Sequence, residues 1–242
     1  MYKYIPFLFL FVAKTASAQL VHANDLIWTR YLVQSNGKSK HYLIGEIDNR
    51  IQSKFGVGKR NQTIFHLHQH FKIHESLDVA VGTSYSNVVR YSPSKKEEVT
   101  MSEVRLFEEL NTKHLEKDNS IIQSRIRVEQ RYFPKEYIGD TQEKLPIQSR
   151  VRYQLQFSQR LNKHLLLKAS NEIMFHAGGW VDYLRMDQNR VYMAARTQFT
   201  PSLAVEAGYL WIINQGIEVT SPMKETDILR FTLHHSLASK NK

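Results

Sequence analysis

The feature that most constrains the fold is a strict alternation of polar and apolar residues along most of the chain. Between residues 121 and 133, every second position is polar, at Gln123, Arg125, Arg127, Glu129 and Arg131, and most of the positions between them are apolar. A helix would spread these side chains around its circumference, whereas a strand collects them on one face. The alternation predicts strands near residues 26–34, 40–53, 63–72, 77–88, 99–110, 121–133, 147–160, 164–176, 187–199, 202–213 and 227–238.

The predicted strands are long, and their length favours a membrane barrel. Strands of globular proteins usually have about 5 or 6 residues, whereas a tilted strand that crosses a membrane needs about 9 to 11. Short and long connections alternate between the segments, as in outer-membrane barrels, although the connection at 111–120 is longer than a tight turn. We therefore predict an all-β protein, an antiparallel transmembrane β-barrel of 10 to 12 strands, in a single domain over residues 19–242.

The number of predicted strands leaves two alternatives open. Bacterial single-chain barrels have an even number of strands, whereas the alternation predicts eleven. Either the segment within residues 19–34 lies outside the barrel wall, or a twelfth strand is hidden elsewhere in the chain.

The first 18 residues have the pattern of a cleaved secretory signal. Lys3 precedes the apolar run 5–13, and Ala16-Ser17-Ala18 forms a small-residue cleavage site. The run is too short to cross a membrane as a helix, and no later window holds the roughly 18 apolar residues that a membrane helix needs. We predict the bacterial outer membrane as the location. A soluble periplasmic β-sandwich or a lipocalin-like binding protein is the alternative.

Patterns of catalytic residues are mostly missing, so a non-enzymatic structural or narrow-channel protein is favoured over an enzyme. The chain has no cysteine and no Gly-x-Ser-x-Gly motif. A lipid-modifying outer-membrane hydrolase is an alternative, and it would need a serine, a histidine and a polar partner at one rim. The best metal candidate is His66-x-His68-x-His70, but no carboxylate nearby in the sequence completes a site. We therefore predict no metal and no cofactor.

Alternation places a ladder of arginines and glutamates on the polar faces of the strands. The candidate binding residues are Arg125, Arg127, Glu129, Arg131, Arg150, Arg152, Glu172 and Arg190. Such a ladder could attract anions into the barrel, or it could pair across strands and close the interior, and we favour the second interpretation.

The net charge of +10 indicates which binding partners to expect. In an exported chain, this charge favours anionic lipopolysaccharide and outer-membrane lipid as partners, together with the barrel-assembly machinery, and argues against nucleic acid.

Five ordered motifs resemble the DUF2490 family, a group of bacterial exported proteins. They are Arg125-x-Arg127-x-Glu129-x-Arg131-Tyr132-Phe133, Arg150-x-Arg152-Tyr153, Asn171-Glu172-x-x-Phe175, Asp187-Gln188-Asn189-Arg190 and Glu206-x-Gly208-Tyr209-Leu210. The resemblance covers nearly all of the chain after residue 18. It implies an outer-membrane β-barrel, and it implies no particular activity.

Overall fold

The computed structural model describes residues 20–35, 39–54, 57–92, 97–132, 147–177, 184–215 and 222–237. The signal segment expected at residues 1–18 lies outside the described residues.

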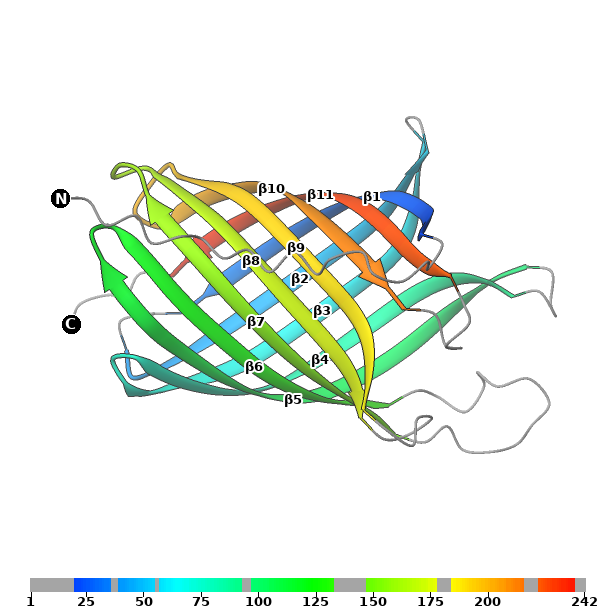
Figure 1. The fold of residues 1–242 in the computed structure, drawn as a ribbon, viewed down its shortest axis with the longest axis horizontal. Coiled ribbons are helices and arrows are strands. Elements are labelled where there is room, and N and C mark those ends of the chain that lie inside the picture. Colours follow the sequence, from blue (N-terminus) through cyan, green and yellow to red (C-terminus); the bar gives the residue numbers. More distant parts are fainter. Residues whose placement is uncertain are drawn as a thin grey trace.

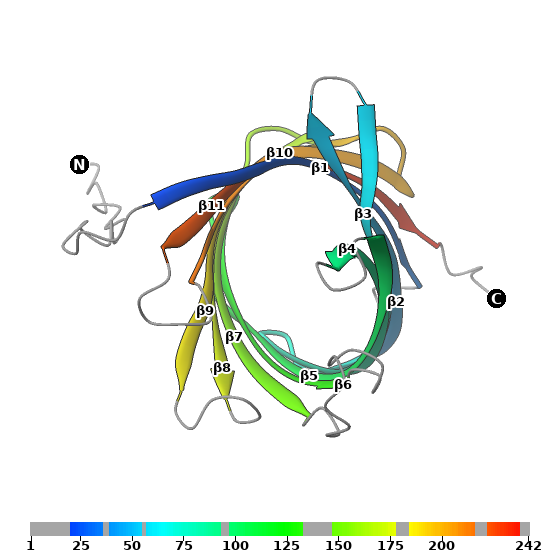
Figure 2. The same ribbon diagram turned by 90° about the vertical axis from the view of Figure 1, so that its right-hand side faces the viewer.

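The described residues form a closed β-barrel of eleven strands (Figures 1 and 2). The strands are β1 (Leu20–Gln34), β2 (His41–Lys54), β3 (Val57–His74), β4 (Leu77–Ser92), β5 (Glu97–Lys117), β6 (Ser120–Tyr132), β7 (Gln148–Arg160), β8 (Leu165–Ala177), β9 (Arg185–Gln198), β10 (Leu203–Asn214) and β11 (Met223–Ser236). The prediction of an all-β barrel with 10 to 12 strands is confirmed. In the described part of the chain there is no helix long and apolar enough to cross a membrane.

The barrel closes through one parallel pair of strands. Consecutive strands pair antiparallel from β1 to β11, and β1 then pairs parallel with β11, with Leu26 opposite Ile228 and Gln34 opposite Ser236. An odd number of alternating strands leaves the first and last pointing the same way, so a closing contact between them must be parallel. Residues 20–34 therefore belong to the wall, and the described residues contain eleven strands and no twelfth. Both alternatives that the sequence left open were wrong, because an odd number of strands closes through this parallel pair.

Several hairpin turns are short and lie at one end of the barrel, on the left in Figure 1. The expected longer connection at 111–120 was wrong: β5 runs to Lys117 and β6 starts at Ser120. The turn between them is Asp118-Asn119, with φ of 50° and 66°. Both residue types tolerate this left-handed conformation, which a tight two-residue hairpin turn requires. We call this end of the barrel the short-turn end.

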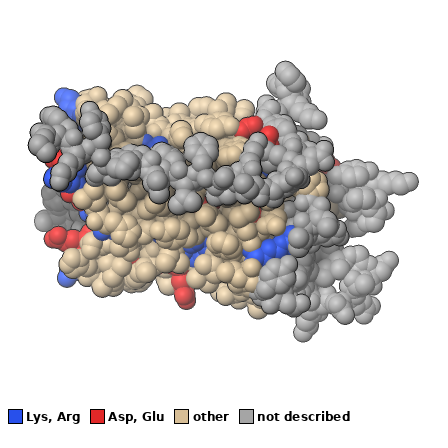
Figure 3. Space-filling model, in the orientation of Figure 1, with Lys and Arg blue, Asp and Glu red and all other residues tan. Residues whose placement is uncertain are grey.

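The two faces of the wall carry different residues. In β5, Glu103, Arg105 and Glu109 are buried inside the barrel, whereas Val104 and Leu106 between them are exposed outside. The same partition recurs around the barrel, and the outer surface in Figure 3 is largely uncharged between its ends. Large apolar side chains exposed on the described strands include Leu43, Ile47, Phe65, Leu67, Val81, Tyr85, Ile126, Val128, Tyr153, Leu155, Met193, Val205, Tyr209, Leu229 and Phe231.

One section of the interior is apolar. Trp28, Tyr192, Leu210, Ile212 and Ile228 pack together against the inner faces of β1, β9, β10 and β11. This cluster fills part of the barrel interior.

Candidate functional site

The barrel encloses a cavity of about 440 Å³ whose lining is mainly polar, and half of the lining residues are charged. Ten arginines and one lysine line it against five acidic residues. The basic residues are Arg30, Arg50, Arg105, Arg125, Arg127, Arg131, Arg150, Arg152, Lys168, Arg190 and Arg230, and the acidic residues are Glu46, Asp48, Glu103, Glu172 and Glu206.

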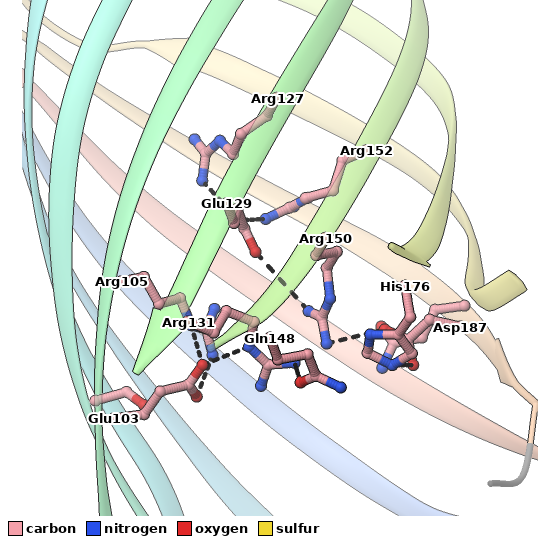
Figure 4. Close-up of polar contacts among 12 residues, drawn as sticks. Glu103, Arg105, Arg127, Glu129, Arg131, Gln148, Arg150, Arg152, His176 and Asp187 are labelled. Carbon is pink, nitrogen blue, oxygen red and sulfur yellow. Dashed lines mark hydrogen bonds and ion pairs between the residues drawn. The ribbon is translucent and has the colours of Figure 1, made fainter. Parts of the chain in front are cut away.

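Glu129 on β6 is the most deeply buried carboxylate of the interior, with 1% of its surface exposed. Its Oε1 lies 2.7 Å from Nη1 of Arg152 and 3.6 Å from Nη1 of Arg127, and its Oε2 lies 4.0 Å from Nη1 of Arg150 (Figure 4). The three arginines come from β6 and β7, where alternation turns every second residue inward. A carboxylate buried this deeply depends on its cationic neighbours, because an unpaired charge out of water is costly.

Arg152 extends the same set of contacts to the next glutamate. Its Nη2 lies 2.8 Å from Oε1 of Glu172 on β8, which also accepts a hydrogen bond of 2.7 Å from Nη2 of Arg125. Nη1 of Arg190 lies 3.6 Å from the other oxygen of Glu172. One guanidinium therefore joins two carboxylates, and charges from β6, β7, β8 and β9 are coupled.

Glu103 on β5 is the carboxylate of a further group of ion pairs. Arg105 donates two hydrogen bonds of 2.8 Å to its two oxygens, and Arg131 donates a third through Nε. Figure 4 shows both arginines converging on this carboxylate. We call Glu103, Glu109, Glu129 and Glu172, with Arg105, Arg125, Arg127, Arg131, Arg150 and Arg152, the ion-pair network.

On the other side of the barrel, two arginines stack on aromatic rings and are not paired with carboxylates of the described residues. Trp28 on β1 stands in register between Arg50 on β2 and Arg230 on β11. The guanidinium carbon of Arg50 lies 3.8 Å from the centre of the Trp28 ring, and that of Arg230 lies 4.8 Å from the centre of the Tyr192 ring. Among the described residues, neither arginine has a carboxylate partner within 4.0 Å. We call Trp28, Arg50, Tyr192 and Arg230 the arginine–aromatic cluster.

The structure brings together all eight candidate binding residues. Seven line the cavity, and Glu129 lies just behind its surface in contact with Arg127, Arg150 and Arg152. Arg190 links the two sides, because its guanidinium carbon is 5.8 Å from the centre of the Trp28 ring and its Nη1 reaches Glu172.

Sequence reasoning missed several members of the interior. Glu109 is buried and binds Arg127. It lies an even number of residues from Glu103 and Arg105 on β5, so alternation places it on the same inner face, and this signal could have identified it. Arg30 and Asp48 face each other across β1 and β2, with an Nη2–Oδ2 distance of 2.7 Å. Their pairing could not be found without the register.

Two histidine–serine contacts bear on the hydrolase alternative. Nδ1 of His74 lies 3.0 Å from Oγ of Ser76, and Nε2 of His114 lies 2.7 Å from Oγ of Ser124. Both contacts are exposed. Within the described ranges, no carboxylate is hydrogen-bonded to either imidazole. A third group that would orient the base, as nucleophilic catalysis requires, is thus missing from the contacts of these pairs.

These features define the chain as a closed β-barrel protein with a charge-lined interior and an apolar outer surface. The chain belongs to the family described as "Protein of unknown function (DUF2490)", which it matches over residues 26–220. The resemblance drawn from the five sequence motifs is therefore confirmed. No curated protein matches the chain significantly.

Proposed function

We propose that this chain is a non-enzymatic outer-membrane β-barrel protein whose narrow, arginine-lined interior admits small anions. The observation that carries the proposal is the partition of side chains between the two faces of the wall: charges lie inside and large apolar side chains lie outside. A soluble barrel or sandwich would have the opposite preference, because its apolar side chains leave water by facing inward.

The strands support the membrane part of the proposal. They have 12 to 21 residues, whereas a tilted membrane strand needs about 9 to 11. A closed barrel also pairs its backbone groups between strands and leaves no sheet edge, as the bilayer core demands. The apolar outer surface would contact outer-membrane lipid and lipopolysaccharide, and the barrel-assembly machinery would insert the chain.

The excess of basic over acidic residues in the cavity lining supports the proposal that the interior admits anions. Basic residues outnumber acidic ones by about two to one in the cavity lining, and Arg50 and Arg230 have no carboxylate partner among the described residues. Rings of arginine and lysine favour anions in pores, and planar guanidinium groups bind carboxylate and phosphate oxygens in pairs. An anion in the cavity would therefore contact the arginine–aromatic cluster first.

A closed, structural barrel is the second candidate, and the ion-pair network favours it. Arg152 joins Glu129 and Glu172, so the inner faces of β6, β7 and β8 are cross-linked by side chains that project into the interior. A network of this kind rigidifies a barrel and narrows any passage through it.

Cell fractionation and one pair of variants test the membrane location. The protein should remain with outer membranes after osmotic shock and should migrate differently on a denaturing gel with and without heating. Leu155→Arg places a charge on the middle of the outer face of β7 and should destabilise the inserted barrel by about 2 to 4 kcal/mol. Leu161→Arg, just after β7 at the short-turn end, is the matched control and should cost about 0 to 1 kcal/mol.

Planar-bilayer recordings test the passage of anions. In a gradient of potassium chloride, the reversal potential should have the sign of a chloride-selective path, and Arg50→Gln should move it toward zero. Channels that open with no selectivity would contradict the anion proposal. A barrel that inserts but gives no conductance would support the closed, structural candidate. Release of the protein by osmotic shock would overturn both candidates.

A further inference from the structure

We propose that His68, His70 and Glu109 form a binding site for one divalent metal ion of the zinc class inside the barrel. One potential ligand atom of each residue lies within 4.8 Å of the others, and all three residues are buried. Imidazole nitrogen and carboxylate oxygen are donors that zinc accepts, usually three from the protein with a water in the fourth position. The carboxylate that the sequence lacked beside the histidines comes from another strand.

The small residues of β4 make this meeting possible. His68 and His70 point inward from β3, and Glu109 points inward from β5, with β4 between them. In register, β4 places Ala80 between His70 and Glu109, and Gly82 opposite His68. A Cβ atom on Gly82 would lie 2.8 Å from Cβ of His68, closer than real side chains approach. The missing side chain at Gly82 makes room for the ring of Phe107, which packs edge-on against His68. Between His70 and Glu109, the residue of β4 in register is the small Ala80.

Each histidine has a carboxylate on the side away from the proposed ion. Nδ1 of His70 lies 2.7 Å from Oδ1 of Asp78, and Nε2 of His68 lies 3.4 Å from Oε1 of Glu46. An ionised carboxylate only accepts hydrogen bonds, so His70 carries its hydrogen on Nδ1 and presents a lone pair at Nε2. The Glu46 carboxylate lies near Nε2 of His68 but forms no hydrogen bond with it. Carboxylate–histidine pairs of this kind fix the tautomer and the orientation of metal-binding imidazoles.

The two inner nitrogens face each other. Nδ1 of His68 and Nε2 of His70 are 3.1 Å apart. Without an ion, Nδ1 of His68 can donate its hydrogen to Nε2 of His70. With the hydrogen of His68 on Nε2 instead, both inner nitrogens present lone pairs, and a cation can bind between them. Two nitrogens bound to one tetrahedral zinc at about 2.0 to 2.1 Å are about 3.3 Å apart, so the separation needs almost no adjustment.

The Asp78 carboxylate is itself held in place. It accepts hydrogen bonds of 2.9 Å from the hydroxyl of Tyr42 and 3.2 Å from Nδ2 of Asn111. The Tyr42 ring also stacks on His70, with 4.6 Å between the ring centres. The orientation of His70 is thus fixed before any ion binds, which favours affinity because little freedom is lost.

Glu109 also belongs to the ion-pair network, and the two roles are compatible. Arg127 and Arg125 both approach its Oε1, the latter at 3.7 Å. A carboxylate has a second oxygen, which can bind a metal while the first stays with the arginines. The negative charges of Glu46 and Asp78 offset the added charge of the ion.

His66 provides a built-in control. It lies two residues before His68 on the inner face of β3 and lines the cavity, but it is not one of the three clustered ligands. A sequence pattern of three alternating histidines does not distinguish it from the other two. The proposed metal site does distinguish it, because His66 is not among the three ligands.

The test uses the full chain, folded in detergent and free of any polyhistidine tag. Zinc is added, unbound metal is removed by desalting, and the metal content is measured by mass spectrometry. We expect one zinc per chain and a higher unfolding temperature with zinc than with a chelator. X-ray absorption of the zinc-bound protein should show two imidazoles and an oxygen-rich remainder.

Variants then assign the ligands, and heat-modifiable migration checks that each one folds. His68→Gln, His70→Gln and Glu109→Gln should abolish binding at micromolar zinc, whereas His66→Gln should leave it unchanged. Asp78→Asn should weaken zinc binding by about 10- to 100-fold, because Asp78 positions a ligand without being one.

Three results would overturn the site. One is a folded wild-type chain that binds no zinc. Another is a zinc spectrum without two imidazoles, which remains decisive if the ligand variants fail to fold. The third is binding that survives His68→Gln or disappears with His66→Gln.

Discussion

Two clusters in the barrel interior hold their arginines in different ways. In the ion-pair network on β5 to β8, guanidinium groups are bound to buried carboxylates, with nitrogen–oxygen distances such as 2.7 Å between Arg152 and Glu129. In the arginine–aromatic cluster, Arg50 and Arg230 lie over the rings of Trp28 and Tyr192. The difference is one of charge: a carboxylate cancels the charge of an arginine, whereas an aromatic ring only reduces its cost.

The two clusters have different expected roles: the ion-pair network stabilises the barrel, and the arginine–aromatic cluster binds anions. An arginine paired with a buried carboxylate supports the wall, because removal of either partner leaves an isolated charge. An arginine over an aromatic ring gains about 0.5 to 2 kcal/mol and keeps its full charge for an incoming anion. Substitutions in the network should therefore change stability most, and substitutions in the cluster should change selectivity most.

The largest effect is expected at Glu129. Glu129→Ala leaves Arg152 and its neighbours without this carboxylate and should lower stability by about 3 to 5 kcal/mol. Thermal unfolding in detergent measures the loss. The double variant Glu129→Ala with Arg152→Gln should recover part of it. A single variant as stable as the parent would show that the network does not support the wall.

The second-largest effect on stability is expected at Gly208 on β10, which packs closely against Tyr192 of the arginine–aromatic cluster. A Cβ atom on Gly208 would lie 2.6 Å from the carbonyl oxygen of Met193 and 2.7 Å from Cε2 of Tyr192. Gly208→Ala should push Tyr192 from its position under Arg230 and cost about 1 to 3 kcal/mol. Ala207→Gly, its neighbour on the outer face, is the control for a change of glycine content in β10. Equal unfolding temperatures for Gly208→Ala and the parent would contradict this account.

The smallest effect on stability is expected in the cluster itself. Arg50→Gln and Arg230→Gln each remove an arginine that has no carboxylate partner among the described residues. The free energy of unfolding should therefore fall by no more than about 2 kcal/mol. Anion selectivity should fall in both variants, as measured by the reversal potential. Arg152→Gln is the contrasting variant, with a large loss of stability. If Arg50→Gln destabilised the barrel as much as Glu129→Ala, the ion-pair network and the arginine–aromatic cluster would contribute equally to stability, which would contradict the comparison.

The sequence predicted much of this architecture because a strand has a fixed period of two. That period was enough to place Arg125, Arg127, Glu129 and Arg131 on one face and to separate them from Ile126 and Val128. Approximate strand positions followed from the same signal. Strand ends were less well predicted: the hairpin at Asp118-Asn119 was concealed because alternation does not show where a strand turns.

What the sequence by itself determined is therefore which face each residue occupies, together with the barrel class and the family. Only the tertiary structure decided which faces meet: the parallel contact of β1 with β11, the arginine stacked on Trp28, and the approach of Glu109 to His68 and His70 across β4. The physical reason is that alternation is a local property of each strand, whereas a contact across strands depends on register and barrel closure. Those depend on pairings between residues far apart in the chain, such as Trp28 with Arg230.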